Sequence, residues 1–175
     1  MVFHPTANLV EYLICPSELS IEKEEWAQKL AMDVANSMNI QGLLAVEMFL
    51  NKDGSIWINE VAPRPHNSGH HTLNNGAISQ FSNHIRSISG LPLGETYGTT
   101  PSLMLNLLGE EDFQGPPIYV GIDKILGLSG VHLYLYGKES TKPYRKMGHL
   151  CITANTIEEC KNIAEIVKEE FKIIS

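Results

Sequence analysis

The hydrophobic residues of this chain follow two periods, and each period predicts a different kind of element. An apolar residue at every fourth position from Trp26 to Met38 predicts an amphipathic helix. Ser17 or Ser20 is its expected N-cap, acidic residues follow in its first turns, and the helix is expected to end near Asn39. The same spacing predicts two further helices along the chain.

The second helix along the chain is expected to start near residues 75–77 and to end at Gly90. Four apolar residues between those points form one stripe, as an amphipathic helix requires. The third helix begins at a capping box, in which Thr156 is followed three positions later by Glu159. Its apolar side is predicted to run as far as Phe171.

Strands are predicted where the sequence is apolar or alternates between apolar and polar positions. These segments are residues 8–14, 42–50, 56–62, 102–107, 131–136 and 148–153. A stretch rich in Gly, Pro and Thr, residues 91–101, separates the first three segments from the last three and predicts a linker. We expect an α+β fold with two units, residues 1–97 and residues 98–175.

The composition of the chain argues against several classes of protein. The 175 residues carry a formal charge of −7, which argues against a general nucleic-acid binder. No apolar run reaches the roughly 20 residues of a membrane span, and the start of the chain does not resemble a signal peptide. The three cysteines lack metal-ligand spacing, so we expect reduced thiols in a cytoplasmic protein.

One local group of basic residues contrasts with this acidic composition. Lys138, Lys142, Arg145 and Lys146 lie close together in the sequence, with Glu139 as the single acid among them. Such a group suits the binding of a small anion. A solvated hairpin tip is the alternative, and the chemistry of the residues leaves both open.

Two glutamates each interrupt an otherwise apolar predicted strand. If Asp53 and Gly54 form a two-residue hairpin loop, Glu47 and Glu60 lie directly opposite each other on one face. Two carboxylates so close require a proton or a cation between them, and Mg²⁺ prefers such oxygen ligands. The alternative is a pair that faces solvent, and a bulge would break the pairing. Four residues predicted to share the face argue against solvent, namely Ala45, Phe49, Ile58 and Ala62.

The loop that follows, residues 62–71, is rich in hydrogen-bond donors and poor in acids. An arginine held between prolines, Arg64, followed by Asn67 and Ser68, would bind an anion beside a metal. Zinc is not expected at the three histidines of the loop, which lack a thiol or a plausible fourth ligand nearby. These histidines are His66, His70 and His71. A loop with exposed histidines is the alternative.

Several of these segments resemble the N5-carboxyaminoimidazole ribonucleotide synthase family, the ATP-grasp carboxylases of purine biosynthesis. The most specific is Ile-Asn-Glu-Val-Ala-Pro-Arg-Pro-His-Asn-Ser-Gly-His at residues 58–70. The others are residues 45–49, 79–81, 91–94, 102–109, 136–139 and 145–149. The resemblance implies the latter part of an ATP-grasp domain, a mixed or antiparallel sheet with helices, followed by a small sheet-and-helix C-terminal domain.

The resemblance also implies an activity, that of an ATP-dependent carbon–nitrogen ligase. ATP, bicarbonate and 5-aminoimidazole ribonucleotide would give N5-carboxyaminoimidazole ribonucleotide, ADP and phosphate, by way of carboxyphosphate. ATP and Mg²⁺ are the implied cofactors, and a homodimer without nucleic-acid or membrane partners is the expected assembly.

The same resemblance assigns roles to residues of the matching motifs. Glu47 and Glu60 would bind the Mg²⁺ ions that bridge the ATP phosphates, and Asn59 with Glu60 would belong to the nucleotide pocket. The implied catalytic residues are Arg64, His66 and Asn67. The implied substrate-binding residues are Asn67, Ser68, Lys138, Arg145 and Lys146, the last two at the 5′-phosphate of the ribonucleotide.

Members of the family are about twice as long as this chain and carry a Rossmann-like domain and a glycine-rich subdomain ahead of the matching part. We therefore expect the chain to correspond to the C-terminal half, to need the missing N-terminal half as a partner and to lack synthase activity by itself. Two alternatives stay open: a related ATP-grasp enzyme, such as the formate-dependent glycinamide ribonucleotide transformylase, and a non-catalytic ligand-binding fragment.

Overall fold

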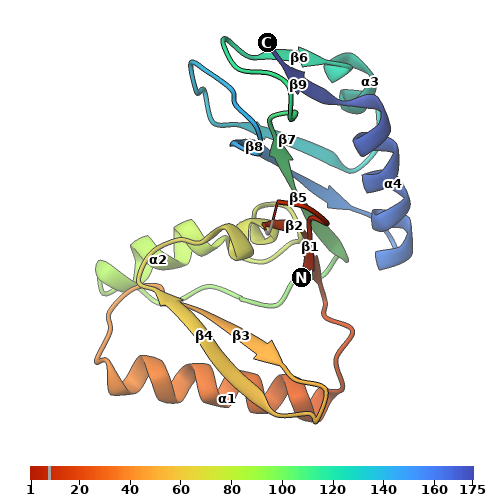
Figure 1. Cartoon of the computed structure of the whole chain (residues 1–175). Coiled ribbons are helices and arrows are strands. Elements are labelled where there is room, and N and C mark those ends of the chain that lie inside the picture. The colour runs from red at the N-terminus through yellow and green to blue at the C-terminus, as the bar shows by residue number, and fades with distance from the viewer. Residues whose placement is uncertain (8) are drawn as a thin grey trace.

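The computed structural model describes residues 1–7 and 9–175. The helices are α1 (Ile21–Ser37), the 3₁₀ helix η1 (Asn67–Leu73), α2 (Gln80–Ile88), α3 (Ile122–Leu126) and α4 (Ile157–Glu170). The strands are β1 (Val2–Phe3), β2 (Val10–Cys15), β3 (Ala45–Leu50), β4 (Ile56–Ala62), β5 (Ser102–Leu108), β6 (Ile118–Val120), β7 (Val131–Leu135), β8 (Lys146–Thr153) and β9 (Lys172–Ile174). Figure 1 shows α1, the β3–β4 hairpin and α2 on one side of the molecule and the larger sheet with α4 on the other.

The larger sheet has the strand order β1-β2-β5-β8-β7, and every pairing between its described strands is antiparallel. Two of its three inner strands, β5 and β8, are buried along nearly their whole length, which their apolar sequences allow. Helix α4 packs against this sheet and contributes Cys160, Ala164 and Val167 to the core. The α+β class predicted from the sequence is therefore confirmed.

Helix α4 begins where its capping box predicts. The hydroxyl oxygen of Thr156 accepts a hydrogen bond from the backbone N–H of Glu159 at 3.1 Å. The short ribbon β6–β9 follows at the end of the helix, and Ile173 of β9 completes the core. The sequence reasoning missed the short elements β1, β6, α3 and β9, which offer no periodic signal of their own.

Three other expectations need correction. The second helix begins at Gln80, several residues after the predicted start, because Ser79 caps it by accepting from the N–H of Ser82. Residues Asn67–Leu73, expected to be an irregular loop, form the helix η1. The first strand runs over Val10–Cys15, and Asn8, part of the predicted segment, lies outside the described residues.

The β3–β4 hairpin places Glu47 opposite Glu60, as predicted, but it does so by a different route. The N–H of Asn51 donates to the carbonyl of Ser55 at 2.9 Å, so the loop contains residues 52–54 and not the two residues expected. Gly54 takes a φ of +86°, a conformation that favours glycine, within this longer loop. The longer loop shifts the pairing register by one residue.

A bulge in β4 restores the register before the glutamates are reached. Met48 pairs with Ile58 and Glu47 pairs with Glu60, so Asn59 has no partner on the facing strand. Ile58 therefore lies on the face opposite to the glutamate pair, which corrects the prediction that it shares their face. The expectation that a bulge would destroy the pairing was wrong, because here the loop and the bulge compensate each other.

The hairpin and α1 bury much less than the larger sheet does. None of the residues of α1, all of which the structure describes, is buried, although the helix has the predicted apolar stripe. Trp57 on the hairpin is 63% exposed. The predicted division at residue 98 remains a prediction; β2, from before it, pairs with β5, from after it.

Candidate functional site

The candidate site lies where the β3–β4 hairpin meets the loop that follows β4. One ligand atom from each of Glu47, Glu60 and His66 can be chosen so that all three lie within 4.8 Å of one another. The Nε2 atom of His66 lies 3.8 Å from the Oε1 atom of Glu47. The side chains of His66 and Glu47 are only 13% and 21% exposed, whereas Glu60 is exposed.

The position of Asn59 follows from the bulge. It is the extra residue of β4, immediately before Glu60, and it is exposed. A bulge changes the direction in which a side chain points. The same irregularity that aligns the two glutamates therefore also sets the direction of Asn59, the residue assigned to the nucleotide pocket by resemblance.

Gln80, at the start of α2, holds His66 in place. Its Oε1 atom accepts from the N–H of His66 at 2.8 Å, and its Nε2 atom donates to the carbonyl of His66 at 2.8 Å. Gln80 is itself buried. The Nδ1 atom of His66 lies 2.9 Å from the hydroxyl of Ser68, so both the backbone and the ring of His66 are fixed. The sequence reasoning missed Gln80, since a polar residue at a helix start gives no sign of burial.

A second polar contact joins this loop to the larger sheet. The amides of Asn67 and Asn106 exchange two hydrogen bonds, at 3.0 and 3.2 Å, and Asn106 also donates to the carbonyl of Val10 at 2.7 Å. Asn67 and Ser68, expected to contact substrate, thus already make contacts within the protein. Asn106 was missed, although one polar residue in an apolar strand is the same signal that identified the glutamates.

The other two histidines of the loop contact other parts of the protein. The ring of His70 stacks on His149 with 4.4 Å between centroids, and burial lowers the pKa of each to about 4. Burial also lowers the pKa of His71, whose Nδ1 atom lies 2.9 Å from the carbonyl oxygen of Ser68. Among the described residues, the three histidines therefore make different contacts.

Three of the four clustered basic residues are close to one another in space. Burial, and then the like charges of Arg145 and Lys146, lower the pKa of Lys138. The ammonium group of Lys138 lies 5.6 Å from the ring centroid of Tyr136 and donates to the carbonyl of Lys146. Arg145 donates to the hydroxyl and carbonyl oxygens of Ser140, both at 3.1 Å.

Lys146 connects this basic group to the carboxylates. Burial lowers its pKa, and the carboxylate of Glu47 opposes that shift. Glu47 is therefore within electrostatic range of Lys146, across a separation of a hundred residues in the sequence. Arg64 is less constrained, since its side chain is exposed and its guanidinium donates to the carbonyl of Pro65 at 3.1 Å.

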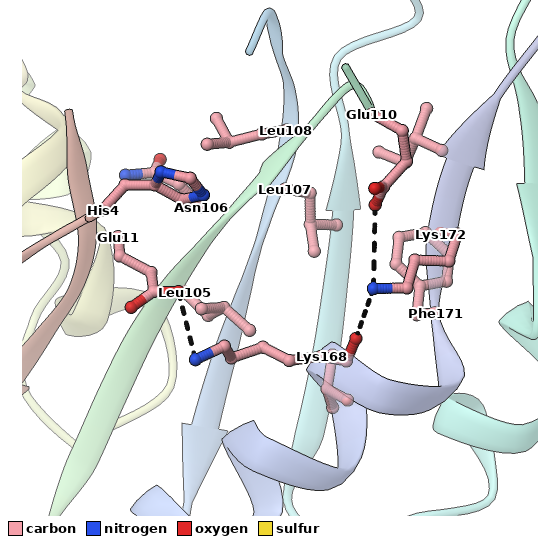
Figure 2. Close-up of a pocket in the computed structure, with 12 residues that line it drawn as sticks. His4, Glu11, Leu105, Asn106, Leu107, Leu108, Glu110, Lys168, Phe171 and Lys172 are labelled. Atoms are coloured by element: carbon pink, nitrogen blue, oxygen red, sulfur yellow. Dashed lines mark hydrogen bonds and ion pairs between the residues drawn. The ribbon is translucent and has the colours of Figure 1, made fainter. Parts of the chain in front are cut away.

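A separate cavity of about 220 Å³ lies between the larger sheet and the end of α4, and Figure 2 shows its lining. Its charged residues are largely paired with each other: Lys168 with Glu11 at 3.1 Å and Lys172 with Glu110 at 3.8 Å. Because these charges are already compensated, the cavity offers less to a charged ligand than the carboxylates of the hairpin do.

The donor set at the hairpin fits a divalent cation. Carboxylate oxygens are the preferred ligands of Mg²⁺, and two carboxylates with substrate phosphates would complete its coordination. The clustered lysines and Arg145 suit a phosphate group. The arrangement can therefore hold a metal and a phosphorylated ligand close together. None of the described helices has the length and apolar character needed to cross a membrane.

Two family models match most of this chain. The ATP-grasp domain family matches residues 4–81, and the phosphoribosylaminoimidazole carboxylase C-terminal domain family matches residues 102–163. The N5-carboxyaminoimidazole ribonucleotide synthase of Bacillus subtilis is 46% identical over 143 residues, which are 82% of this chain and 36% of that protein.

Solved structures give the same result. The N5-carboxyaminoimidazole ribonucleotide synthetase of Thermotoga maritima superimposes with a TM-score of 0.90 at 41% identity, over 94% of this chain and 46% of that one. The Aspergillus clavatus N5-carboxyaminoimidazole synthase, in complex with ADP and 5-aminoimidazole ribonucleotide, has a TM-score of 0.83 at 31% identity. That match covers 96% of this chain and 44% of the other. The chain thus spans less than half the length of these relatives.

Proposed function

The chain belongs to the N5-carboxyaminoimidazole ribonucleotide synthase family of ATP-grasp enzymes, and from this premise we propose that its residues supply the metal-binding and ribonucleotide-binding part of that active site. The reaction joins ATP, bicarbonate and 5-aminoimidazole ribonucleotide to give N5-carboxyaminoimidazole ribonucleotide, ADP and phosphate. The observation that carries the proposal is that Glu47 lies opposite Glu60 and also within electrostatic range of Lys146, a residue from a distant part of the sequence.

Glu47 and Glu60 hold the Mg²⁺ ion, which neutralises the negative charge of the ATP phosphates when bound. Asn59 contacts the nucleotide beside them. A carboxylate pair already opposed across a hairpin needs little rearrangement to accept the cation, since β3 and β4 fix both backbones. This preorganisation is the contribution of the hairpin to the reaction.

Lys138, Arg145 and Lys146 hold the 5′-phosphate of the ribonucleotide. Burial, and then the like charges of Arg145 and Lys146, lower the pKa of Lys138, so part of that shift is the electrostatic cost of gathering like charges. A bound phosphate would remove that cost. Arg64, His66, Asn67 and Ser68 would then contact the carboxyphosphate formed from bicarbonate and the γ-phosphate of ATP.

The proposed partner of these residues is the N-terminal half that the longer relatives contain. The exposed apolar side chains of α1 and the hairpin, Trp57 among them, are a suitable packing surface for it. The use of bicarbonate and the homodimer stay predictions that rest on the family. A cytoplasmic location is also proposed, and the three free cysteines of the structure are compatible with it.

Calorimetric titration tests the roles proposed for the basic group and for the carboxylate pair. We expect 5-aminoimidazole ribonucleotide to bind the wild-type chain and to bind at least tenfold more weakly after Lys146→Met, because a phosphate contact is lost. Mg²⁺ binding should weaken after Glu60→Gln. The matched control is Lys29→Met on the exposed face of α1, which should change neither affinity.

Two outcomes would contradict the proposal. Equal binding of 5-aminoimidazole ribonucleotide by the wild type and Lys146→Met would remove the phosphate role of the basic group. Tighter binding of glycinamide ribonucleotide than of 5-aminoimidazole ribonucleotide would favour the formate-dependent transformylase instead.

A further inference from the structure

His149 lies in a stack of rings formed by η1 and the larger sheet. The centroid of its ring is 4.4 Å from that of His70 and 4.7 Å from that of Tyr134, at interplanar angles of 23° and 9°. Only 4% of the residue is exposed. A ring packed on both faces has little freedom to turn. The direction of its two ring nitrogens is therefore fixed.

One of these nitrogens contacts Tyr136, the residue that follows β7. The Nδ1 atom of His149 lies 3.0 Å from the hydroxyl of Tyr136. At the other end of the same residue, the backbone N–H of Tyr136 donates to the carbonyl of Met147 at 2.9 Å. Tyr136 itself is 39% exposed. Because both ends of the residue are bonded, its ring is held in place although much of it faces solvent.

The ring of Tyr136 in turn holds the ammonium group of Lys138. This group lies over the ring, 5.6 Å from its centroid, and donates to the carbonyl of Lys146. Neither partner carries a negative charge, so both attract the cation without neutralising it. A carboxylate in the same place would compete with an anionic ligand for the ammonium group. The contacts of Lys138 therefore suit a lysine that binds an anion.

A lysine gains affinity from such support because of its flexible stem. The ammonium group stands on four carbons with rotatable bonds, and fixing those bonds costs conformational entropy. A lysine that is already held loses this entropy when the protein folds and not when the ligand binds. The position of Tyr136 should therefore affect how tightly Lys138 binds a phosphate.

We propose that Tyr136 is a positioning residue for Lys138, and that His149 acts through Tyr136 by fixing its hydroxyl. The inference rests on the proposed role of Lys138 at the 5′-phosphate of the ribonucleotide and adds two residues that act through it. Removing the hydroxyl of Tyr136 or the Nδ1 atom of His149 breaks the same hydrogen bond. Each change should therefore weaken ribonucleotide binding by a similar factor, about three- to tenfold.

Calorimetric titration of the full chain with 5-aminoimidazole ribonucleotide tests these contacts. Tyr136→Phe and His149→Phe keep both rings and remove the two sides of one hydrogen bond, so the double variant should bind no more weakly than either single one. Lys138→Met should weaken binding at least about tenfold. In that background neither change should weaken binding further, because the residue on which they act is absent. Tyr134→Phe, which removes a hydroxyl that donates to Asn74, is the matched control and should bind as the wild type does.

Nuclear magnetic resonance of the chain labelled with ¹³C-lysine tests the arrangement without a ligand. Protons above an aromatic ring resonate upfield, so the ε-methylene group of Lys138 should give an upfield signal that disappears in Lys138→Met. Tyr136→Leu should abolish the upfield shift and His149→Phe should reduce it. Tyr134→Phe should leave it unchanged. An unchanged shift in His149→Phe would overturn the part assigned to His149.

The outcomes of the titration separate this inference from the proposed function. Binding that depends on Lys138 but is unaltered in Tyr136→Phe and His149→Phe would overturn the positioning role and leave the phosphate contact intact. Further weakening by either change in the Lys138→Met background would also overturn it, because the two residues would then act by another route. A wild-type chain that does not bind the ribonucleotide would overturn the proposed function and, with it, the role of Lys138 on which this inference rests.

Discussion

The larger sheet and the β3–β4 hairpin are both antiparallel, yet they bury their side chains to very different extents. β5 and β8 are almost wholly buried, and the core formed around them includes three residues of α4. The hairpin has four exposed large apolar side chains from Phe49 to Ile58, and α1 has no buried residue at all. Both regions have clear periodic patterns in the sequence.

The difference shows what periodicity can and cannot predict. An apolar stripe reports that a face is suited to packing, and it does not report whether the same chain supplies the covering element. The site lies at the junction of these two regions: the hairpin carries Glu47 and Glu60, and the sheet carries Lys146. The carboxylate pair therefore has a weakly packed support, whereas Lys146 lies on a well-buried strand.

The largest predicted effect is the difference in unfolding free energy between truncating a buried side chain of the larger sheet and truncating an exposed one of α1. Met147→Ala removes a fully buried side chain from β8 and should lower the free energy of unfolding by about 2–5 kcal/mol. Met32→Ala makes the same chemical change on α1, where the side chain is 64% exposed, and should cost less than about 0.5 kcal/mol. Urea denaturation measures both. Equal losses would show that α1 is packed in solution.

The pH dependence of stability should come from the stacked histidines on the sheet side. The pKa of His149 is about 4 in the folded protein because of burial, and its unfolded value is near 6.5. The unfolded chain therefore binds more protons between these values, so stability is complete above about pH 6.5 and falls as the pH drops towards 4. The loss is on the order of 3 kcal/mol for one such histidine.

His149→Phe isolates this contribution from that of the carboxylates. It keeps a ring against His70 and removes the titrating group, so the fall in stability between pH 6.5 and 4 should become smaller. His132→Gln, at an exposed position on the neighbouring strand, should leave the slope unchanged. An unaltered slope in His149→Phe would mean that His149 is not buried in its neutral form.

The contact between η1, which follows the hairpin in the sequence, and β5 of the larger sheet should have an intermediate effect on stability. Asn106→Ala leaves the amide of Asn67 and the carbonyl of Val10 without their partner, at a cost of about 1–3 kcal/mol. Hydrogen exchange should also become faster across η1, because the loop loses its connection to β5. Asn162→Ala on the exposed side of α4 is the control and should change neither quantity.

The fold was more predictable from the sequence than the site was. The longer strands of the larger sheet (β2, β5, β7 and β8) and α4 were found within a few residues, because strand and helix periods are strong in these segments. The start of α2 was misjudged, since the cap is a single serine, Ser79, whose hydrogen bond cannot be recognised from spacing. The short helix η1 was taken for a loop because its residues are polar and include glycine.

The pairing of Glu47 with Glu60 was predicted correctly, although the predicted hairpin loop had the wrong length. A loop of two residues and a loop of three with a bulge at Asn59 give the same pairing, and the sequence cannot distinguish them. The contacts of Gln80 and Asn106 could not be found by periodicity, because they join segments distant in the chain. The roles assigned to the site residues remain predictions until binding is measured.

The smallest predicted effect is the loss of stability when the N-cap residue of α1 or of α4 is replaced. Ser20 and Thr156 are both N-caps, but only Thr156 accepts a side-chain hydrogen bond, from the N–H of Glu159. Thr156→Ala should therefore cost about 1 kcal/mol, and Ser20→Ala a few tenths at most. Urea denaturation of the two variants checks this. A larger loss for Ser20→Ala would mean that α1 is capped in solution and contributes to global stability, so the weakly packed region would be more tightly coupled to the sheet than its burial indicates.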